Sequence, residues 1–194
     1  AQEPPAECRG FPRFCTFTGI TAFAPDDVWV AGNAMLPGFL GPLLFHWNGV
    51  EWRSVPVGIT QEPYVLTAVD GSSPDDLWAV GNLFNSAEPF VVHGDGKQWT
   101  VVPGLADGRL DGLAINAAGR PWVLRNTVLP SAHLALNNPD GSWTDVAAPL
   151  PKGAVGATLT GIAAVPGTGT LFAVGTADLS TAPRTVTGYI VTFA

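Results

Sequence analysis

One short phrase recurs along the chain: an aromatic residue followed three positions later by glycine and then by asparagine. It is complete in residues 20–33 (ITAFAPDDVWVAGN) and in residues 66–82 (LTAVDGSSPDDLWAVGN), and weaker copies lie at 110–126 and 159–176. The aromatic markers stand 49, 44 and 50 residues apart; they are Trp29, Trp78, Trp122 and Phe172. A period of this size indicates one structural unit that is repeated along the chain.

Each unit has the pattern of short strands rather than helices. Runs of four to eight residues rich in Val, Leu, Phe, Trp and Thr alternate with Gly, Pro, Asn and Asp, which is typical of strands joined by turns. The second unit predicts four strands, which we call a to d in order, at 66–70, 77–82, 89–93 and 98–103. Four strands in about 45 residues, repeated, are typical of a β-propeller blade.

We therefore predict an all-β, four-bladed β-propeller of about 16 antiparallel strands. The whole chain, 1–194, forms one domain in this interpretation. The blades are expected at about 20–58, 64–104, 109–151 and 158–194.

The fourth unit ends after three strands, since only residues 187–193 follow its aromatic marker as a further strand. An apolar segment at residues 11–17 lies where a preceding strand d would be. We expect residues 1–19 to act as a closing segment that completes the last blade and hides two sheet edges. The alternative is that this segment is a free N-terminal arm.

The motifs also resemble a known family. Residues 25–32 (PDDVWVAG), then 46–49 (HWNG) and Trp52 resemble the pattern DVWAVG…HW-G…W of secreted bacterial propeller repeats, which are grouped with kelch-like or galactose-oxidase-like propellers. The resemblance covers about 175 residues from Ile20 onward. It implies the propeller fold, but the family usually has more than four blades. The kelch double glycine and counterparts of the galactose-oxidase copper ligands are missing, so the resemblance implies no activity.

Composition excludes several classes of function. The net charge is −7 and only nine residues are Lys or Arg, which argues against binding to a phosphate backbone or to an anionic membrane surface. No apolar run reaches 18 residues, so no membrane-spanning helix is expected.

The two cysteines, Cys8 and Cys15, predict one disulfide that closes a short loop. No His or second Cys pair completes a zinc set around them, so no metal is expected there. A disulfide, together with a first residue other than Met, indicates a secreted mature chain. The alternative is a pair of unpaired buried thiols.

Candidate binding residues lie in the links between strands b and c. These links are long and apolar, and in a propeller they share one face, where binding residues usually lie. The candidate ligand-binding residues are Asn33, Leu36, Phe39, Asn82, Phe84, Asn126 and Thr176. Alternatively, the asparagines cap strand ends and the apolar side chains fold back onto the ring.

Other polar residues have simpler explanations. The pairs Asp26–Asp27 and Asp75–Asp76 are explained by turn formation, because the third and fourth units lack them. Equivalent positions in different blades are far apart, so a shared metal site is not expected at His46, His93 and His133. The tryptophans that begin strand d either pack or stack on a sugar; they are Trp52, Trp99 and Trp143.

The sequence predicts only a general class of function. The primary hypothesis is a secreted, non-catalytic binding module for a saccharide, an apolar small molecule or a protein, with no cofactor. One alternative is an enzyme of lyase or cyclase type that uses a shaped pocket. The other is a half-ring that forms a homodimer.

Overall fold

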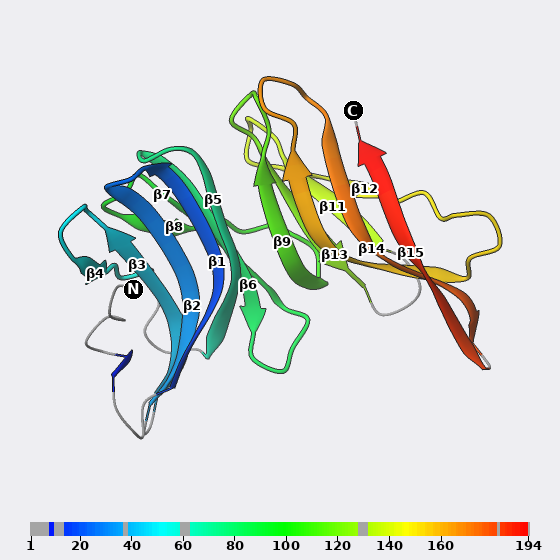
Figure 1. Ribbon diagram of the computed structural model, residues 1–194, viewed down its shortest axis with the longest axis horizontal. Helices are drawn as coiled ribbons and strands as arrows, with labels where there is room; N and C mark the ends of the chain where they lie inside the picture. Colours follow the sequence, from blue (N-terminus) through cyan, green and yellow to red (C-terminus); the bar gives the residue numbers. More distant parts are fainter. Residues whose placement is uncertain are drawn as a thin grey trace. The chain divides into compact units, whose positions relative to one another are not determined.

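The computed structural model describes residues 8–9, 14–36, 39–58, 63–127, 132–181 and 183–193. All fifteen secondary-structure elements of this described part are β-strands. They form four antiparallel sheets (Figure 1). The all-β prediction is confirmed.

The first two sheets have four strands each, in sequence order. The first contains β1 (Phe14–Ala24), β2 (Asp27–Leu36), β3 (Phe39–Trp47) and β4 (Trp52–Ser54). The second contains β5 (Tyr64–Ser73), β6 (Asp76–Leu83), β7 (Pro89–Gly94) and β8 (Trp99–Val101).

The third sheet has four strands and the fourth has three. The third contains β9 (Arg109–Ile115), β10 (Pro121–Asn126), β11 (Ala132–Asn137) and β12 (Trp143–Ala147). The fourth contains β13 (Gly156–Ala164), β14 (Leu171–Thr181) and β15 (Arg184–Phe193).

The chain divides into two compact units. Unit 1 comprises residues 1–86 and 90–103, and unit 2 comprises 87–89 and 104–194. In unit 1 the first sheet packs on the second through a core of alternate strand residues that includes Trp29, Leu44, Leu66, Leu77 and Phe90. In unit 2 the third sheet packs on the fourth through Leu124, Leu134, Leu159, Leu171 and Tyr189. Each sheet thus buries one face against its neighbour.

A β-bulge recurs at the same place in the first strand of every sheet. One residue of each of these strands is skipped in the pairing; the skipped residues are Thr18, Thr67, Asp111 and Thr160. A bulge shifts the phase of the side chains and increases the local twist. Beside three of the bulges the partner strand carries glycine, at Gly32, Gly81 and Gly175.

The structure corrects the prediction of closure by the N-terminal segment. Residues 14–17 belong to β1 and pair with residues 32–35 of β2, so they extend the first sheet and complete no other. Residues 11–13 lie outside the described part. The fourth sheet has three strands in the described part, as the sequence indicated.

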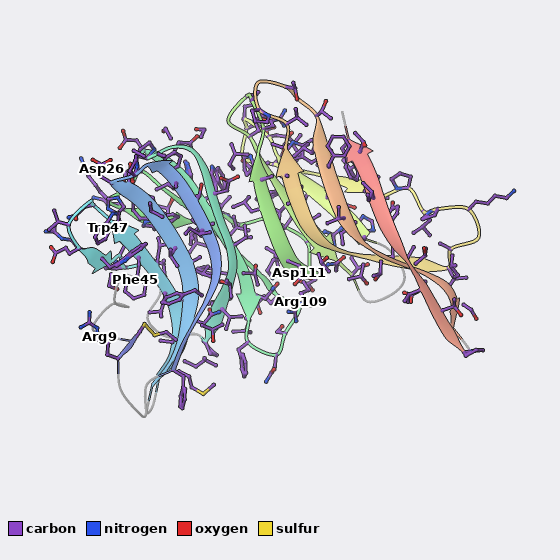
Figure 2. The ribbon with its side chains drawn as sticks, in the orientation of Figure 1. Arg9, Asp26, Phe45, Trp47, Arg109 and Asp111 are labelled. Carbon is purple, nitrogen blue, oxygen red and sulfur yellow. A yellow bond between two sulfur atoms is a disulfide. The ribbon has the colours of Figure 1, made fainter. Side chains whose placement is uncertain are left out.

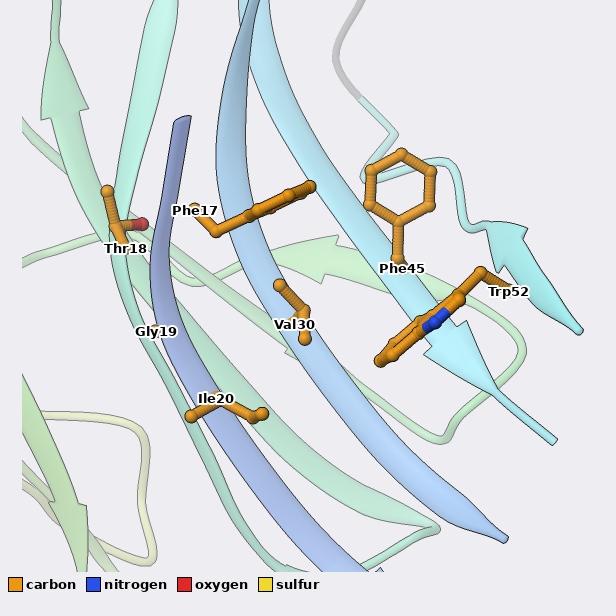
Figure 3. A pocket seen from close by; sticks show the side chains of 7 residues that line it. All are labelled: Phe17, Thr18, Gly19, Ile20, Val30, Phe45 and Trp52. Carbon is orange, nitrogen blue, oxygen red and sulfur yellow. The ribbon is translucent and has the colours of Figure 1, made fainter. Parts of the chain in front are cut away.

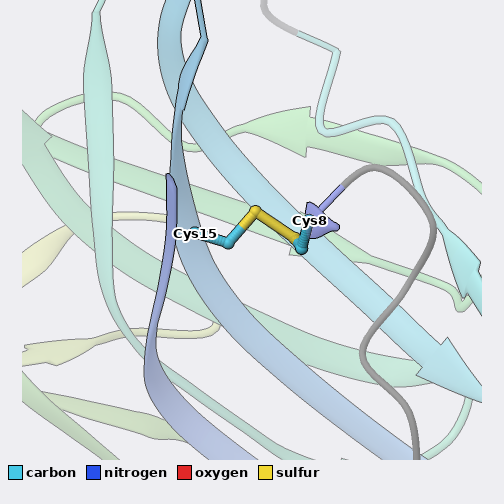
Figure 4. Close-up of a disulfide and its surroundings, with 2 residues drawn as sticks. All are labelled: Cys8 and Cys15. Carbon is cyan, nitrogen blue, oxygen red and sulfur yellow. A yellow bond between two sulfur atoms is a disulfide. The ribbon is translucent and has the colours of Figure 1, made fainter. Parts of the chain in front are cut away.

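The predicted disulfide is present. Cys8 and Cys15 are bonded, with their Cα atoms 5.5 Å apart, which places Cys8 beside β1 (Figure 4). Among the described residues, no helix is long and apolar enough to cross a membrane.

Candidate functional site

An apolar hollow of about 480 Å³ lies on the first sheet (Figure 3). It is on the face turned away from the second sheet, because Val30 and Phe45 alternate with the core residues Trp29 and Leu44. All four strands contribute to its lining, which comprises Phe17, Thr18, Gly19, Ile20, Val30, Phe45 and Trp52.

The bulge at Thr18 creates the floor of the hollow. In a regular strand Phe17 and Ile20 would point to opposite faces, because side chains alternate with a period of two. The extra residue shifts the phase, so both side chains line the hollow. Phe17 then packs its ring edge-on against Phe45, with ring centroids 6.2 Å apart.

The chemistry of the hollow is apolar. Among the described residues that line it, none has an ionisable side chain, and the Thr18 hydroxyl donates to the Leu66 carbonyl oxygen at 2.9 Å. Phe17 is 47 % exposed and Ile20 is 69 % exposed, whereas Phe45 is buried. The hollow can therefore hold an apolar surface by burial but offers no acid or base for catalysis.

Two of the predicted ligand residues join neighbouring sheets. Asn33 Nδ2 donates to the Leu66 carbonyl at 3.1 Å, and the Leu66 N–H donates to Asn33 Oδ1 at 2.7 Å. Asn126 makes the same pair of bonds with Leu159, at 2.8 and 3.1 Å. We call this two-bond contact the asparagine clamp. It gives both amides a structural role, and a ligand-binding role for them stays a prediction.

Asn126 also donates to Asp111 Oδ2 at 2.8 Å. Asp111 is the bulge residue of β9, and it pairs with Arg109 at 2.7 Å on the same strand (Figure 2). The third sheet therefore replaces the bulge threonine of the other sheets with a charged pair.

The other predicted ligand residues lie in different environments. Asn82 is buried, Thr176 is exposed on β14, and Phe84 is 43 % exposed beyond β6. The backbones of Leu36 and Phe39 lie in β2 and β3, whereas their side chains lie outside the described part of the structure. Their role in binding stays a prediction.

The aspartates that we attributed to turns also bind histidines. In the first sheet His46 Nε2 lies 2.8 Å from Asp27 Oδ1, and the His46 ring stacks on Trp29 with centroids 4.4 Å apart. The second sheet repeats this cluster: His93 lies 2.7 Å from Asp76 and stacks on Trp78 at 4.2 Å. The turn explanation was therefore incomplete. Both units place an Asp two residues before the marker Trp and a His later in the same unit, and this was the signal available in the sequence.

Electrostatics favours an ionised Asp76. Burial would raise the pKa of this carboxyl, but hydrogen bonds from Ser72 and His93 and the charge of His93 outweigh burial. The pKa of Asp76 therefore lies below its ordinary value of 3.8. Because the folded pKa is lowered, the stabilisation is complete above the unfolded value of about 3.9 and is lost as pH falls through the folded pKa.

We predict that Asp76→Asn removes part of this acid dependence. The variant should unfold more easily at neutral pH, and its urea midpoint should fall less than that of the wild type below about pH 4. Urea unfolding over a pH series measures this. Asp75→Asn, at the exposed neighbouring position, is the control and should follow the wild type; equal acid slopes for Asp76→Asn and wild type would refute the prediction.

A buried cation distinguishes the third sheet. Arg125, only 7 % exposed, occupies the position of the repeated glycine. Its guanidinium donates to Asp145 Oδ1 at 2.5 Å, and His133 Nδ1 lies 2.6 Å from Asp145 Oδ2. Burial would raise the pKa of Asp145, but the hydrogen bond and charge of Arg125 and the contact with His133 lower it below 3.8. This cluster, like the Asp–His–Trp clusters, ties strands of one sheet together.

The three histidines thus have separate aspartate partners. No group of three or more His, Cys, Asp or Glu side chains within the described ranges could hold a metal ion. Of the tryptophans that begin the fourth strands, Trp99 is 7 % exposed and packs in the core of unit 1. Trp52 lines the hollow.

No family model matches the chain, and no curated protein matches it, so the resemblance to kelch-like repeats stays a prediction. Two solved structures are similar. YCF48 bound to D1 peptide has a TM-score of 0.53 and 15 % identity over 85 % of this chain and 48 % of that chain. A triple arginine-to-alanine mutant of AofleA from Arthrobotrys oligospora has a TM-score of 0.57 and 10 % identity over 92 % of this chain and 53 % of that chain.

The chain thus spans about half the length of each of these two structures. Both are β-propellers. At this identity the likeness bears on the fold alone. Together with the four antiparallel sheets, it identifies a β-propeller type of fold.

Proposed function

We propose that this protein is a non-catalytic binding module, in which the four sheets are four propeller blades. It binds an apolar ligand or protein surface in the hollow on the first sheet. The observation that carries the proposal is the exposure of Phe17 and Ile20, 47 % and 69 %, in a hollow whose described lining residues are all non-ionisable.

The energetics favour an apolar partner over a saccharide. Full burial of one large apolar side chain contributes about 1.5–3 kcal/mol, so covering Phe17 and Ile20 alone supports measurable affinity. A saccharide needs several hydrogen-bonding groups, whereas the hydroxyl of Thr18 is engaged with Leu66. The two similar structures agree with a binding role in general terms, because one has a bound peptide and the other is a lectin-type propeller.

The disulfide between Cys8 and Cys15 supports function in an oxidising compartment, and we propose that the protein is secreted. A lyase or cyclase remains the alternative. It would need reactive groups, and the ionisable pairs in the first two sheets connect strands to one another instead.

The test is a titration of dilute protein with 1-anilinonaphthalene-8-sulfonate, a fluorescent probe that has apolar aromatic rings and one sulfonate group. Ile20→Asp should weaken probe binding at least tenfold, because a charge in the hollow opposes burial of an apolar ring. The melting temperature should change little, since Ile20 is largely exposed.

The matched control is Val50→Asp. Val50 is 84 % exposed in the turn between β3 and β4 and does not line the hollow. Its substitution should leave the probe affinity unchanged. Equal affinities for the wild type and Ile20→Asp would show that the hollow is not the binding site.

A further inference from the structure

Each sheet has two distinct faces. In the first and third sheets, one face packs on the next sheet of the same unit, and we call it the leading face. The same name is used for the face with equivalent residues in the second and fourth sheets. The opposite face of every sheet is the trailing face. The leading face of the first sheet carries Ala31 and Leu44, which are paired in register and are 0 % and 1 % exposed. The leading face of the third sheet carries the equivalent pair, Leu124 and Leu134, both 0 % exposed.

The leading face of the fourth sheet keeps this apolar pair but leaves it uncovered. Val174 and Ile190 are in register at the equivalent positions and are 44 % and 71 % exposed. Phe172, two residues before Val174, is 43 % exposed on the same face. Side chains that are buried between sheets elsewhere in the chain therefore face solvent here.

The trailing face of the first sheet shows the same mismatch. Phe17 occupies the position of Leu66 and Leu159, because all three pair with the repeated glycine. Leu66 and Leu159 are both 0 % exposed, whereas Phe17 is 47 % exposed. This face contains the hollow.

Small residues give independent evidence for a close neighbour at the fourth sheet. Gly19 follows the bulge of β1, and a Cβ there would lie 2.9 Å from the Val69 nitrogen of the next sheet. Gly112 follows the bulge of β9, and a Cβ there would lie 2.9 Å from Leu124 of its own sheet and 3.2 Å from Ile162 of the next sheet. Gly161 has the equivalent place in β13, where a Cβ would lie 3.1 Å from Val174 of its own sheet and, within the described part of the chain, near no residue of another sheet.

We infer that a second copy of this chain binds here, with the leading face of its fourth sheet on the trailing face of the first sheet. The inference rests on the proposed function and names the partner of the same hollow. The contact continues the sheet-to-sheet packing present within both units, with Val174 and Ile190 meeting Phe17 and Ile20. Thr176 would lie where Asn33 and Asn126 make the asparagine clamp. In the proposed dimer this contact forms twice, because the fourth sheet of each copy binds the first sheet of the other copy. Both exposed faces of each copy are then covered.

The first experiment measures mass in solution by light scattering after size-exclusion chromatography. The wild type should have twice the 20.2 kDa mass of one chain. Ile20→Asp and Ile190→Asp should each weaken association at least tenfold and shift the mass towards the monomer. Val50→Asp should remain a dimer, and circular dichroism should show that all variants keep their strands.

Mixing the variants tests which faces meet. In a mixture of Ile20→Asp and Ile190→Asp, each dimer of unlike chains retains one intact interface, so part of the dimer should return. If like faces paired, one of the two variants would remain a dimer by itself, which would overturn the inference. A monomeric wild type would also overturn it.

The probe separates this inference from the proposed function. Gly161→Val should block the leading face of the fourth sheet and give a monomer that binds 1-anilinonaphthalene-8-sulfonate in the free hollow. A monomeric wild type that loses probe binding on Ile20→Asp would refute the dimer and leave the binding function intact. A monomeric wild type whose probe binding is unchanged by Ile20→Asp would refute both the dimer and the proposed binding function.

Discussion

Replacing Gly81 with valine should abolish cooperative unfolding, with a loss of more than about 4 kcal/mol in the free energy of unfolding. A Cβ at Gly81 would lie 1.9 Å from the Val65 carbonyl oxygen and 2.8 Å from the Leu66 Cα. Both atoms belong to the backbone of β5, so no side-chain rotation can relieve the clash. The bulge at Thr67 brings the two strands this close.

Urea unfolding followed by circular dichroism measures the effect. Gly169→Val is the control, because Gly169 lies in the exposed turn before β14 and a Cβ there would meet no described atom within 4 Å. That variant should unfold near the wild-type midpoint. If Gly81→Val retained the wild-type midpoint, the bulge would not be the reason for glycine at this position.

Gly32 and Gly175 have the same surroundings. Their added Cβ atoms would lie 2.3 and 2.0 Å from the carbonyl oxygens of Thr16 and Thr158. The repeated glycine of the sequence is therefore explained by close approach of the backbone at the bulge.

The strands could be predicted because their signals are local. Apolar runs between turn residues predicted the four strands β5 to β8. The fourth unit ends after its third apolar run, which predicted a sheet of three strands. The Cys8–Cys15 disulfide followed from the count and spacing of cysteines. Each of these features is carried by a few adjacent residues.

Features that depend on distant pairing could not be predicted. Residues 14–17 are as apolar as a closing strand should be, and only their pairing with β2 places them in the first sheet. The Asp27–His46 and Asp76–His93 contacts join residues 19 and 17 positions apart across two strands. The hollow was missed because Phe17 and Ile20 share a face only when the bulge at Thr18 shifts their phase.

The third unit shows why one copy of the repeat is weak in sequence. Arg125 replaces the repeated glycine, and Gly108 leaves room for it, since a Cβ at Gly108 would lie 2.6 Å from Arg125 Cγ. In the other sheets the glycine lies in the second strand, whereas in the third sheet Gly108 lies just before β9, the strand that pairs with β10. Asp145 and His133 then accompany the buried cation.

Asn33→Ala should lower the free energy of unfolding by about 2–4 kcal/mol. It removes both bonds of the clamp and leaves the Leu66 N–H without the Asn33 acceptor. A buried donor left unsatisfied costs about 1–3 kcal/mol, and loss of the bond to the Leu66 carbonyl costs about 1 kcal/mol. Because the clamp joins two sheets of unit 1, amide exchange at Leu66 should become faster. Asn126→Ala should act in the same way on Leu159 in unit 2.

Asn48→Ala is the control for the clamp. The Asn48 side chain also accepts two backbone N–H bonds, from Val50 and Glu51, but these lie in an exposed turn where water can replace them. Its loss should be about 1 kcal/mol or less. Asn33→Asp gives a finer test, since it keeps an acceptor for the Leu66 N–H but places a carboxylate oxygen against the Leu66 carbonyl. If urea unfolding and hydrogen exchange gave Asn33→Ala no larger effect than Asn48→Ala, the asparagines would not hold the sheets together, and their amides would again be candidates for ligand binding.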